Sequence, residues 1–127
     1  MNILGLDYGT KNIGLAWVDT SIGAVLPYGI MKNKGQKVSN KELADLVKAE
    51  KIDKMVIGLP LGLGGQENYN TMRVREFANG IKELVGIPIE FINEIFSSAQ
   101  ADRMGEGVSR DEKSAMIILE DYLNQIR

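Results

Sequence analysis

The fold is decided by residues 2–18, which read NILGLDYGTKNIGLAWV. The apolar run before Asp7 predicts a buried strand, while Gly9 and Asn12 predict a tight turn into a second strand over residues 13–18. Asp7 is thus placed on or beside the core of a sheet. Because an unpaired carboxylate is costly to remove from water, a cation, a metal ion or a strong donor is expected to meet it. The simpler alternative is that Asp7 only braces the turn by a hydrogen bond to the backbone.

Working outward, the pattern predicts an antiparallel meander followed by two crossover units. Pro27 suits an edge strand, because proline cannot donate to a ladder. Gly86 suits a left-handed helix end. The predicted strands cover residues 2–6, 13–18, 24–31, 54–60 and 88–92, and the predicted helices cover about 39–50, 70–85, 97–104 and 109–125.

Two capping boxes are expected to start helices, one at Ser39 to Glu42 and one at Ser109 to Glu112. Helical spacing also predicts which side chains face the core. On the second helix these are Val74, Phe77, Ala78, Ile81 and Leu84, and on the last helix Ala115, Ile118, Leu119, Tyr122 and Leu123.

The predicted fold class is α/β, a single domain over residues 1–127 with a five-stranded mixed sheet and helices on both faces. The element order, β-β-β-α-β-α-β-α-α, is the one found in ribonuclease-H-like domains. A binding site is expected outside the strand ends, in the loops after the first, fourth and fifth strands.

Composition excludes several chemistries. The chain has no cysteine and no histidine, so thiolate zinc sites, disulfides and histidine-based nucleophile activation are excluded. Lys and Arg number 15 against 17 Asp and Glu, so the strongly basic balance of many nucleic-acid-binding proteins is missing. No secretion signal or membrane span is evident, and a cytoplasmic protein is expected.

Three carboxylates are predicted to meet at one sheet edge. Asp7 ends the first strand, Glu94 follows the fifth, and Asp111 lies one turn before Ala115 on the core-facing stripe of the last helix, whereas Glu112 faces elsewhere. Considered singly, Glu94 could be a solvated strand-end residue and Asp111 a helix-start residue favoured by the helix dipole. Considered together, they need cations, because two carboxylates about 4 Å apart repel by about 4 kcal/mol at an effective dielectric near 20.

Oxygen ligands without histidine or cysteine favour Mg²⁺ or Mn²⁺. Two such ions, about 3.5 to 4 Å apart, can clamp the attacking water and the leaving oxygen of a phosphodiester. The three acids therefore predict nuclease chemistry.

Four ordered motifs, which together span essentially the whole chain, make it resemble the YqgF/RuvX-like family of Holliday-junction-resolvase-like nucleases. They are residues 4–16 (LGLDYGTKNIGLA), residues 56–61 (VIGLPL), Asn93-Glu94, and Asp111 before residues 114–123 (SAMIILEDYL). The resemblance implies a ribonuclease-H-like fold, divalent-metal-dependent cleavage of structured RNA or branched DNA, and a role in maturing the precursor of small-subunit ribosomal RNA. Precursor ribosomal particles are implied partners, and a monomer or homodimer is expected. The family's acidic positions fall on Asp7, Glu94 and Asp111.

Two departures weaken the expected grip on the nucleic-acid backbone. Asn93-Glu94-Ile95 replaces the family's usual Asp-Glu-Arg, and the basic loop before Asp111 is shortened. Lys11, Arg73 and Arg110 are the basic residues expected to meet phosphates, and each could equally be a solvated surface charge.

Two rival functions stay open. The segment around Asp7 also resembles the first phosphate-binding hairpin of actin-like ATPases and sugar kinases, although those proteins close two such domains over ATP and this chain has length for one. The other rival is a binding module for RNA or a ribosomal partner that has kept the nuclease core without its activity.

Overall fold

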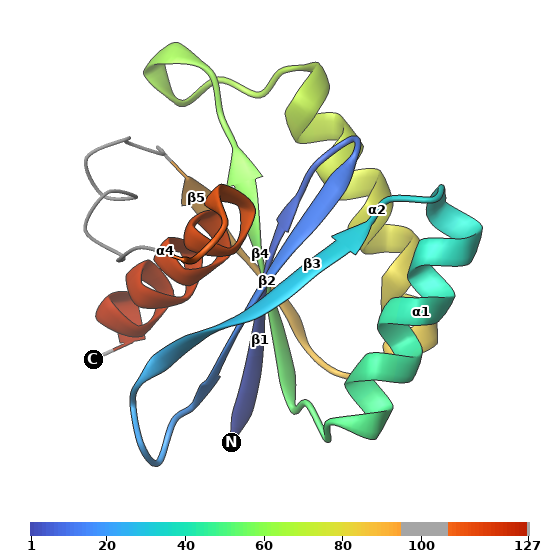
Figure 1. Cartoon of the computed structure of the whole chain (residues 1–127). Helices are drawn as coiled ribbons and strands as arrows, with labels where there is room; N and C mark the ends of the chain where they lie inside the picture. Colours follow the sequence, from blue (N-terminus) through green and yellow to red (C-terminus); the bar gives the residue numbers. More distant parts are fainter. Residues whose placement is uncertain (95–106, 127) are drawn as a thin grey trace.

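The computed structural model describes residues 1–94 and 107–126, and a five-stranded sheet lies at its centre (Figure 1). The strand order is β3-β2-β1-β4-β5. Antiparallel pairs join β1 to β2 and β2 to β3, whereas β4 runs parallel to β1 and to β5. The strands are β1 (Asn2–Tyr8), β2 (Asn12–Asp19), β3 (Val25–Lys32), β4 (Lys54–Pro60) and β5 (Ile89–Glu94).

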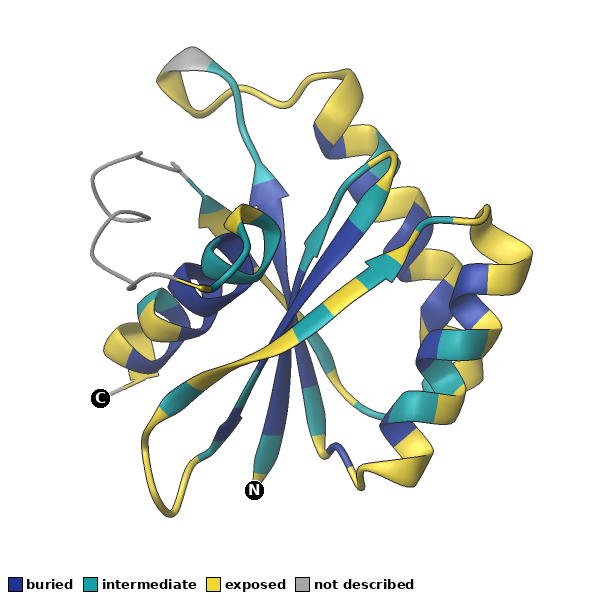
Figure 2. Cartoon of the chain, viewed as in Figure 1, coloured by how far each residue is buried: buried dark blue, intermediate teal, exposed yellow. Residues whose placement is uncertain are grey.

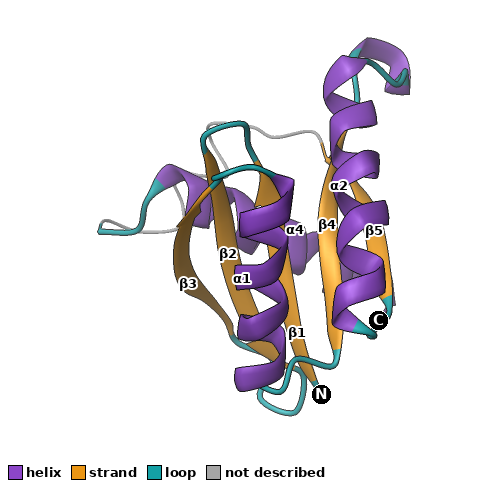
Figure 3. Cartoon of the chain, turned by 90° about the vertical axis from the view of Figure 1, so that its right-hand side faces the viewer, coloured by secondary structure: helices purple, strands orange, loops and turns teal. Residues whose placement is uncertain are grey.

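Helices cover both faces of this sheet (Figures 1 and 3). Helices α1 (Gln36–Ala49) and α2 (Tyr69–Val85) pack side by side on one face, and α4 (Arg110–Ile126) crosses the other face and contacts all five strands. A short 3₁₀ helix, η1 (Leu63–Gly65), follows β4. The fold class and the mixed sheet are as predicted. The short helix expected over residues 97–104 lies outside the described residues.

Two hydrophobic cores follow from the alternation of side chains along the strands. On β1, Leu4 and Leu6 join the core beneath α1 and α2, whereas Ile3 joins the core beneath α4. Figure 2 shows the central strands buried and the outer faces of the helices exposed. At the far end of α4, the Tyr122 hydroxyl donates to Glu90 of β5 and accepts a hydrogen bond from Lys54 of β4, at 2.9 Å, which ties the helix to two strands.

Helix α4 packs closely on the sheet because three strands present glycine to it. A Cβ added at Gly5 or Gly58 would stand 2.5 Å from the side chain of Leu119 or Ile118, respectively. A Cβ at Gly14 would stand 2.0 Å from the backbone oxygen of Asp111. Larger side chains at these positions would push the helix away from the strands.

Two of three predicted helix ends match the structure, and one does not. The box at Ser109 is confirmed: the Ser109 hydroxyl accepts the Glu112 amide at 3.1 Å, and Glu112 accepts the Ser109 amide at 3.4 Å. Gly86, with φ of 65°, ends α2 as predicted. The box at Ser39 is wrong, since α1 begins three residues earlier, at Gln36, and the Ser39 hydroxyl accepts the Lys34 amide from within the first turn.

Leu84 is also misplaced by the spacing argument. Its predicted companions on α2 are buried, but Leu84 is 56% exposed. Leu84 instead lines the groove between α1 and α2, whereas the next residue, Val85, packs against the core beneath these helices. Pro27, in contrast, lies on β3 at the sheet edge, as predicted. None of the helices in the described part of the chain is long and apolar enough to span a membrane.

Candidate active site

Asp7 lies at the end of β1, on the face that α4 covers. Side chains alternate along the strand, so Asp7 follows Ile3 and Gly5 on that face. Its partner on β2 is Gly14, the residue over which the Asp111 backbone passes. The close contact between Gly14 and the backbone of Asp111 therefore brings the first turn of α4 next to Asp7.

Asp111 lies in that first turn, which its neighbours hold in place. The reciprocal hydrogen bonds between Ser109 and Glu112 fix the start of α4 and turn Glu112 back toward the cap. Asp111, one turn before the buried Ala115, is left on the sheet side of the helix. The helix dipole favours a negative charge there, typically by about 0.3–1 kcal/mol.

Glu94 ends β5 and points to the same face. It pairs with Pro60 at the end of β4, and it lies two residues after the buried Ile92 of the α4-side core. A Cβ at Gly58 would stand 2.7 Å from Glu94 Oε2, so the carboxylate occupies space left by the missing side chain. Its Oε1 atom is buried and has no hydrogen-bond partner within the described structure.

Burial and mutual repulsion raise the pKa values of two of these acids. Burial raises the pKa of Asp7, the charge of Asp111 raises it further, and a hydrogen bond with Ser114 partly offsets both. Burial, the largest cause, raises the pKa of Glu94 together with the charges of Asp7 and Asp121, to about 8 in total. Asp7 is therefore coupled electrostatically to Glu94 on one side and to Asp111 on the other.

The structure thus joins the three predicted acids in two pairs that share Asp7. Asp111 is not among the charges that act on Glu94. Within residues 1–94 and 107–126, no group of three or more acidic side chains is arranged so that it could already hold a metal ion. A divalent cation nevertheless fits the chemistry of these residues, because it would supply Glu94 Oε1 with a partner and would neutralise the repulsion that raises both pKa values.

Asp121 is a further acid near this site that the sequence argument missed. It lies three residues after Ile118, whose side chain packs against Gly58, and its own pKa is raised by burial. The helical spacing from Ile118 was a usable signal, because residues three apart on a helix share a side.

The three basic residues that were predicted to bind phosphates do not lie together. Lys11 is exposed in the turn between β1 and β2, and Arg110 is exposed directly before Asp111. Arg73 belongs to α2, where its guanidinium lies 5.8 Å from the ring centroid of Tyr8 and donates to Asn70 at 3.1 Å. The Tyr8 ring stacks on Phe77 in the core beneath α2, so Arg73 is on the opposite face from the acids.

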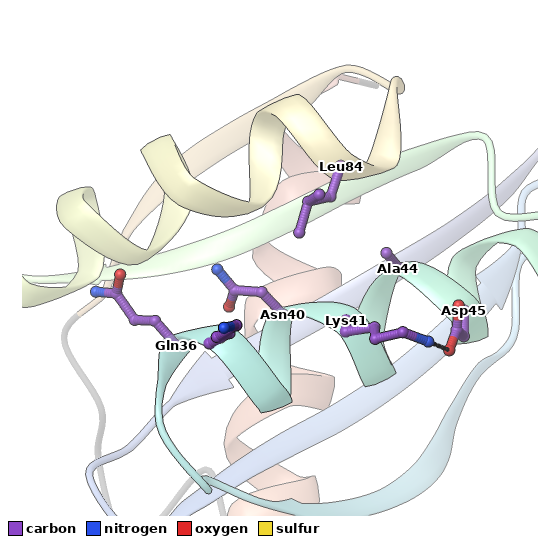
Figure 4. Close-up of a pocket in the computed structure, with 7 residues that line it drawn as sticks. Gln36, Asn40, Lys41, Ala44, Asp45 and Leu84 are labelled. Atoms are coloured by element: carbon purple, nitrogen blue, oxygen red, sulfur yellow. Dashed lines mark hydrogen bonds and ion pairs between the residues drawn. The ribbon is translucent and has the colours of Figure 1, made fainter.

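A cavity of about 680 Å³ lies elsewhere, in the groove between α1 and α2 (Figure 4). Figure 4 shows Asn40 of α1 pointing toward α2, with Leu84 of α2 on the far side of the groove. None of the three predicted acids lines this cavity, and it is on the face of the sheet opposite α4. Its size is therefore no evidence about the carboxylate site.

The fold and the acidic strand ends define a ribonuclease-H-like domain of the resolvase type. The family model described as "RuvX: Holliday junction resolvase" matches residues 1–125, and the chain belongs to this family. A protein of Maridesulfovibrio salexigens named "Putative pre-16S rRNA nuclease" is 35% identical, with 97% of this chain and 98% of the relative covered. One of Streptococcus mutans with the same name is 34% identical, with 99% of each chain covered.

Solved structures support the same fold at much lower sequence identity. The chain is similar to T. thermophilus RuvC in complex with a Holliday junction substrate, with a TM-score of 0.66, 11% identity and coverage of 99% of this chain and 96% of that one. The fowlpox virus Holliday junction resolvase gives a TM-score of 0.65 at 16% identity, with 98% and 99% covered. At these identities the similarity concerns the fold alone.

Proposed function

We propose that this protein is a divalent-metal-dependent nuclease that hydrolyses phosphodiester bonds in structured nucleic acid, with the precursor of 16S ribosomal RNA as its substrate. Membership of the RuvX family supports the class of reaction, and the names of the relatives support the substrate. We place the reaction in the cytoplasm, with precursor ribosomal particles as partners.

The observation that carries the proposal is the pairing of Asp7 with Glu94. The Glu94 carboxylate is largely buried beside Gly58, its Oε1 has no hydrogen-bond partner among the described residues, and its pKa is raised to about 8. A carboxylate kept in this state stabilises nothing by itself, since burial without a partner opposes folding. Acidic side chains with strongly shifted pKa values are typical of functional sites.

Asp7, Glu94 and Asp111 would hold the divalent ions, with Asp7 shared between the two pairs. When bound, such ions activate a water molecule and stabilise the charge on the leaving oxygen. The protein itself supplies carboxylates at strand and helix ends and a close contact between Gly14 and α4 that fixes the position of Asp111. Since the chain has no histidine, no imidazole competes with these oxygen ligands.

Thermal unfolding with Mn²⁺, followed by cleavage assays, tests this proposal. Mn²⁺ is expected to raise the melting temperature of the wild type, because binding to the folded state alone stabilises it. Asp7→Asn is expected to abolish this rise and to abolish cleavage of precursor 16S RNA. Asp45→Asn, which alters an exposed acid paired with Lys41 at 3.2 Å, is the matched control and should behave as wild type.

Two results would contradict parts of the proposal. A wild-type protein that binds precursor RNA in Mn²⁺ without cutting it would establish the non-catalytic binding module instead. A wild-type protein that cuts a four-way DNA junction while leaving precursor RNA intact would keep the reaction and overturn the substrate.

A further inference from the structure

The edge strand β3 contains a bulge that changes which side chains face α4. Before the bulge, Pro27 pairs with Ala16 of β2; after it, Gly29 pairs with Leu15. Tyr28 is the extra residue, because two steps along β3 correspond to one step along β2. Gly29 has φ of 131°, a backbone conformation that favours glycine.

The bulge moves the second half of β3 by one residue, and a shift of one residue exchanges the two faces of a strand. Val25, before the bulge, packs in the core beneath α4. With uninterrupted alternation, Ile30 and Lys32 would lie on the opposite face from Val25. Because of the bulge, Ile30 instead pairs with Gly14 and Lys32 with Asn12, and Met31 packs against the core beneath α1 and α2.

Lys32 therefore lies on the same face of the sheet as the acids. Asp7, Gly14 and Ile30 form one row across β1, β2 and β3, and cross-strand partners share a face. Lys32 is two residues beyond that row. From strand spacings of about 4.8 Å and a rise of about 3.3 Å per residue, its Cα is about 12 Å from that of Asp7.

The ammonium group of Lys32 is not used in an ion pair within the described segments, and hydrogen bonds of the next residue fix its backbone position. Its side chain is exposed and forms no ion pair with any residue of the described segments, whereas Lys34 is paired with Glu42 at 2.9 Å. The next residue, Asn33, donates from its amide to the Lys11 carbonyl at 2.8 Å and from its side chain to the Gly9 carbonyl at 2.9 Å. These bonds tie the end of β3 to the turn that carries Lys11.

We propose that Lys32, placed by the bulge at Tyr28 and Gly29, binds a backbone phosphate of the nucleic-acid substrate a few nucleotides from the bond that is cut, with Lys11 beside it. The inference rests on the proposed nuclease function. A separation of about 12 Å corresponds to about three or four nucleotides of one strand when it is measured along the axis of a B-form duplex, at about 3.4 Å per nucleotide. Bulges beside active sites commonly serve to redirect a side chain in this way.

Binding measured over a range of salt concentrations tests the role of Lys32. Precursor 16S RNA is used as the ligand in EDTA, where the strand stays intact, with a four-way DNA junction in parallel. Lys32→Gln is expected to weaken binding by roughly threefold to tenfold and to reduce the slope of log K against log salt by about 0.7 to 0.9, the loss of one phosphate contact. Lys32→Arg should restore both values.

Lys82→Gln is the matched control, because Lys82 is an exposed lysine in the last turn of α2, on the other face of the sheet. It should leave affinity and slope unchanged, and the melting temperatures of all three variants should match the wild type. If Lys32→Gln behaves as Lys82→Gln while the wild type binds and cuts RNA, the inference about Lys32 is overturned and the nuclease stands. If the wild type binds neither ligand, both proposals fail.

Discussion

Gly14 lies so close beneath the first turn of α4 that a Cβ there would stand 2.0 Å from the backbone oxygen of Asp111. Because Gly14 is also the β2 partner of Asp7, the distance between strand and helix sets the distance between the two acids. A residue without a side chain is thus as important for the geometry of the site as the carboxylates themselves.

Gly14→Ala is expected to lower both stability and metal binding. The added methyl group must displace the backbone of α4, which typically costs about 1–3 kcal/mol and moves Asp111 away from Asp7. Urea unfolding should show the loss of stability, and the rise in melting temperature with Mn²⁺ should shrink. Gly62→Ala is the control, because the nearest atoms to its Cβ would be at 3.3 and 3.4 Å. An unchanged Mn²⁺ response in Gly14→Ala would contradict this role.

Glu94 predicts a specific dependence of stability on pH in the absence of metal. Its pKa is about 8 in the folded protein and near 4.5 when unfolded, so between these values the folded state binds more protons. Stability must therefore fall as pH rises from about 5 to 8, and the raised pKa of Asp7 acts in the same direction. Melting in EDTA at pH 5, 6.5 and 8 measures the trend.

Glu94→Gln is the variant that isolates this contribution. It should remove most of the decline and melt higher than the wild type at pH 8, since an uncharged amide avoids the burial of a charge. A decline as steep in Glu94→Gln as in the wild type would show that other groups cause it. Mn²⁺ should bind the wild type more tightly at pH 8 than at pH 6, because protons compete for the same oxygens.

Ser109→Ala tests the link between the helix cap and the acid that follows it. Loss of the cap is expected to cost about 1 kcal/mol and to loosen the first turn of α4, so that the Mn²⁺ response weakens. Ser109→Asp keeps a capping oxygen and should retain stability and response. If Ser109→Ala loses stability but keeps the full Mn²⁺ response, the helix cap does not contribute to metal binding.

Gly29→Ala tests the bulge. At φ of 131° an alanine is strained, which is expected to cost about 1–3 kcal/mol in urea unfolding and to disturb the placement of Lys32. The salt dependence of RNA binding should then shift toward that of Lys32→Gln. If the slope in Gly29→Ala stays at the wild-type value, the bulge does not position Lys32.

Much of the fold was predictable because apolar periodicity and turn residues act locally. Asp111 was placed correctly on the α4 stripe, since its position follows from residues one turn away. The start of α1 was not, because Ser39 satisfies a different amide, that of Lys34, and a capping pattern cannot show which amide its hydroxyl will meet. Leu84 was misplaced because periodicity does not indicate which part of an apolar stripe the neighbouring helix leaves uncovered.

The approach of the three acids to one end of the strands was predictable, and their arrangement was less so. The strand ends and the core-facing stripe of the last helix placed Asp7, Glu94 and Asp111 near the same end of the sheet. Their pairing through Asp7, however, depends on the close contacts between α4 and the glycines beneath it, which join segments far apart in the sequence. The bulge was likewise beyond a periodicity argument, because it appears only when the register of β3 against β2 is known.

The docking of α4 also sets an order of events during folding. Asp7 belongs to β1, whereas Asp111 and the apolar surface that covers this face of the sheet belong to α4, which follows β5 along the chain. Since α4 must pack on the sheet before Asp111 comes near Asp7, the two acids meet only once this contact between distant segments has formed. A chain whose sheet has formed without α4 therefore does not yet have the paired carboxylates.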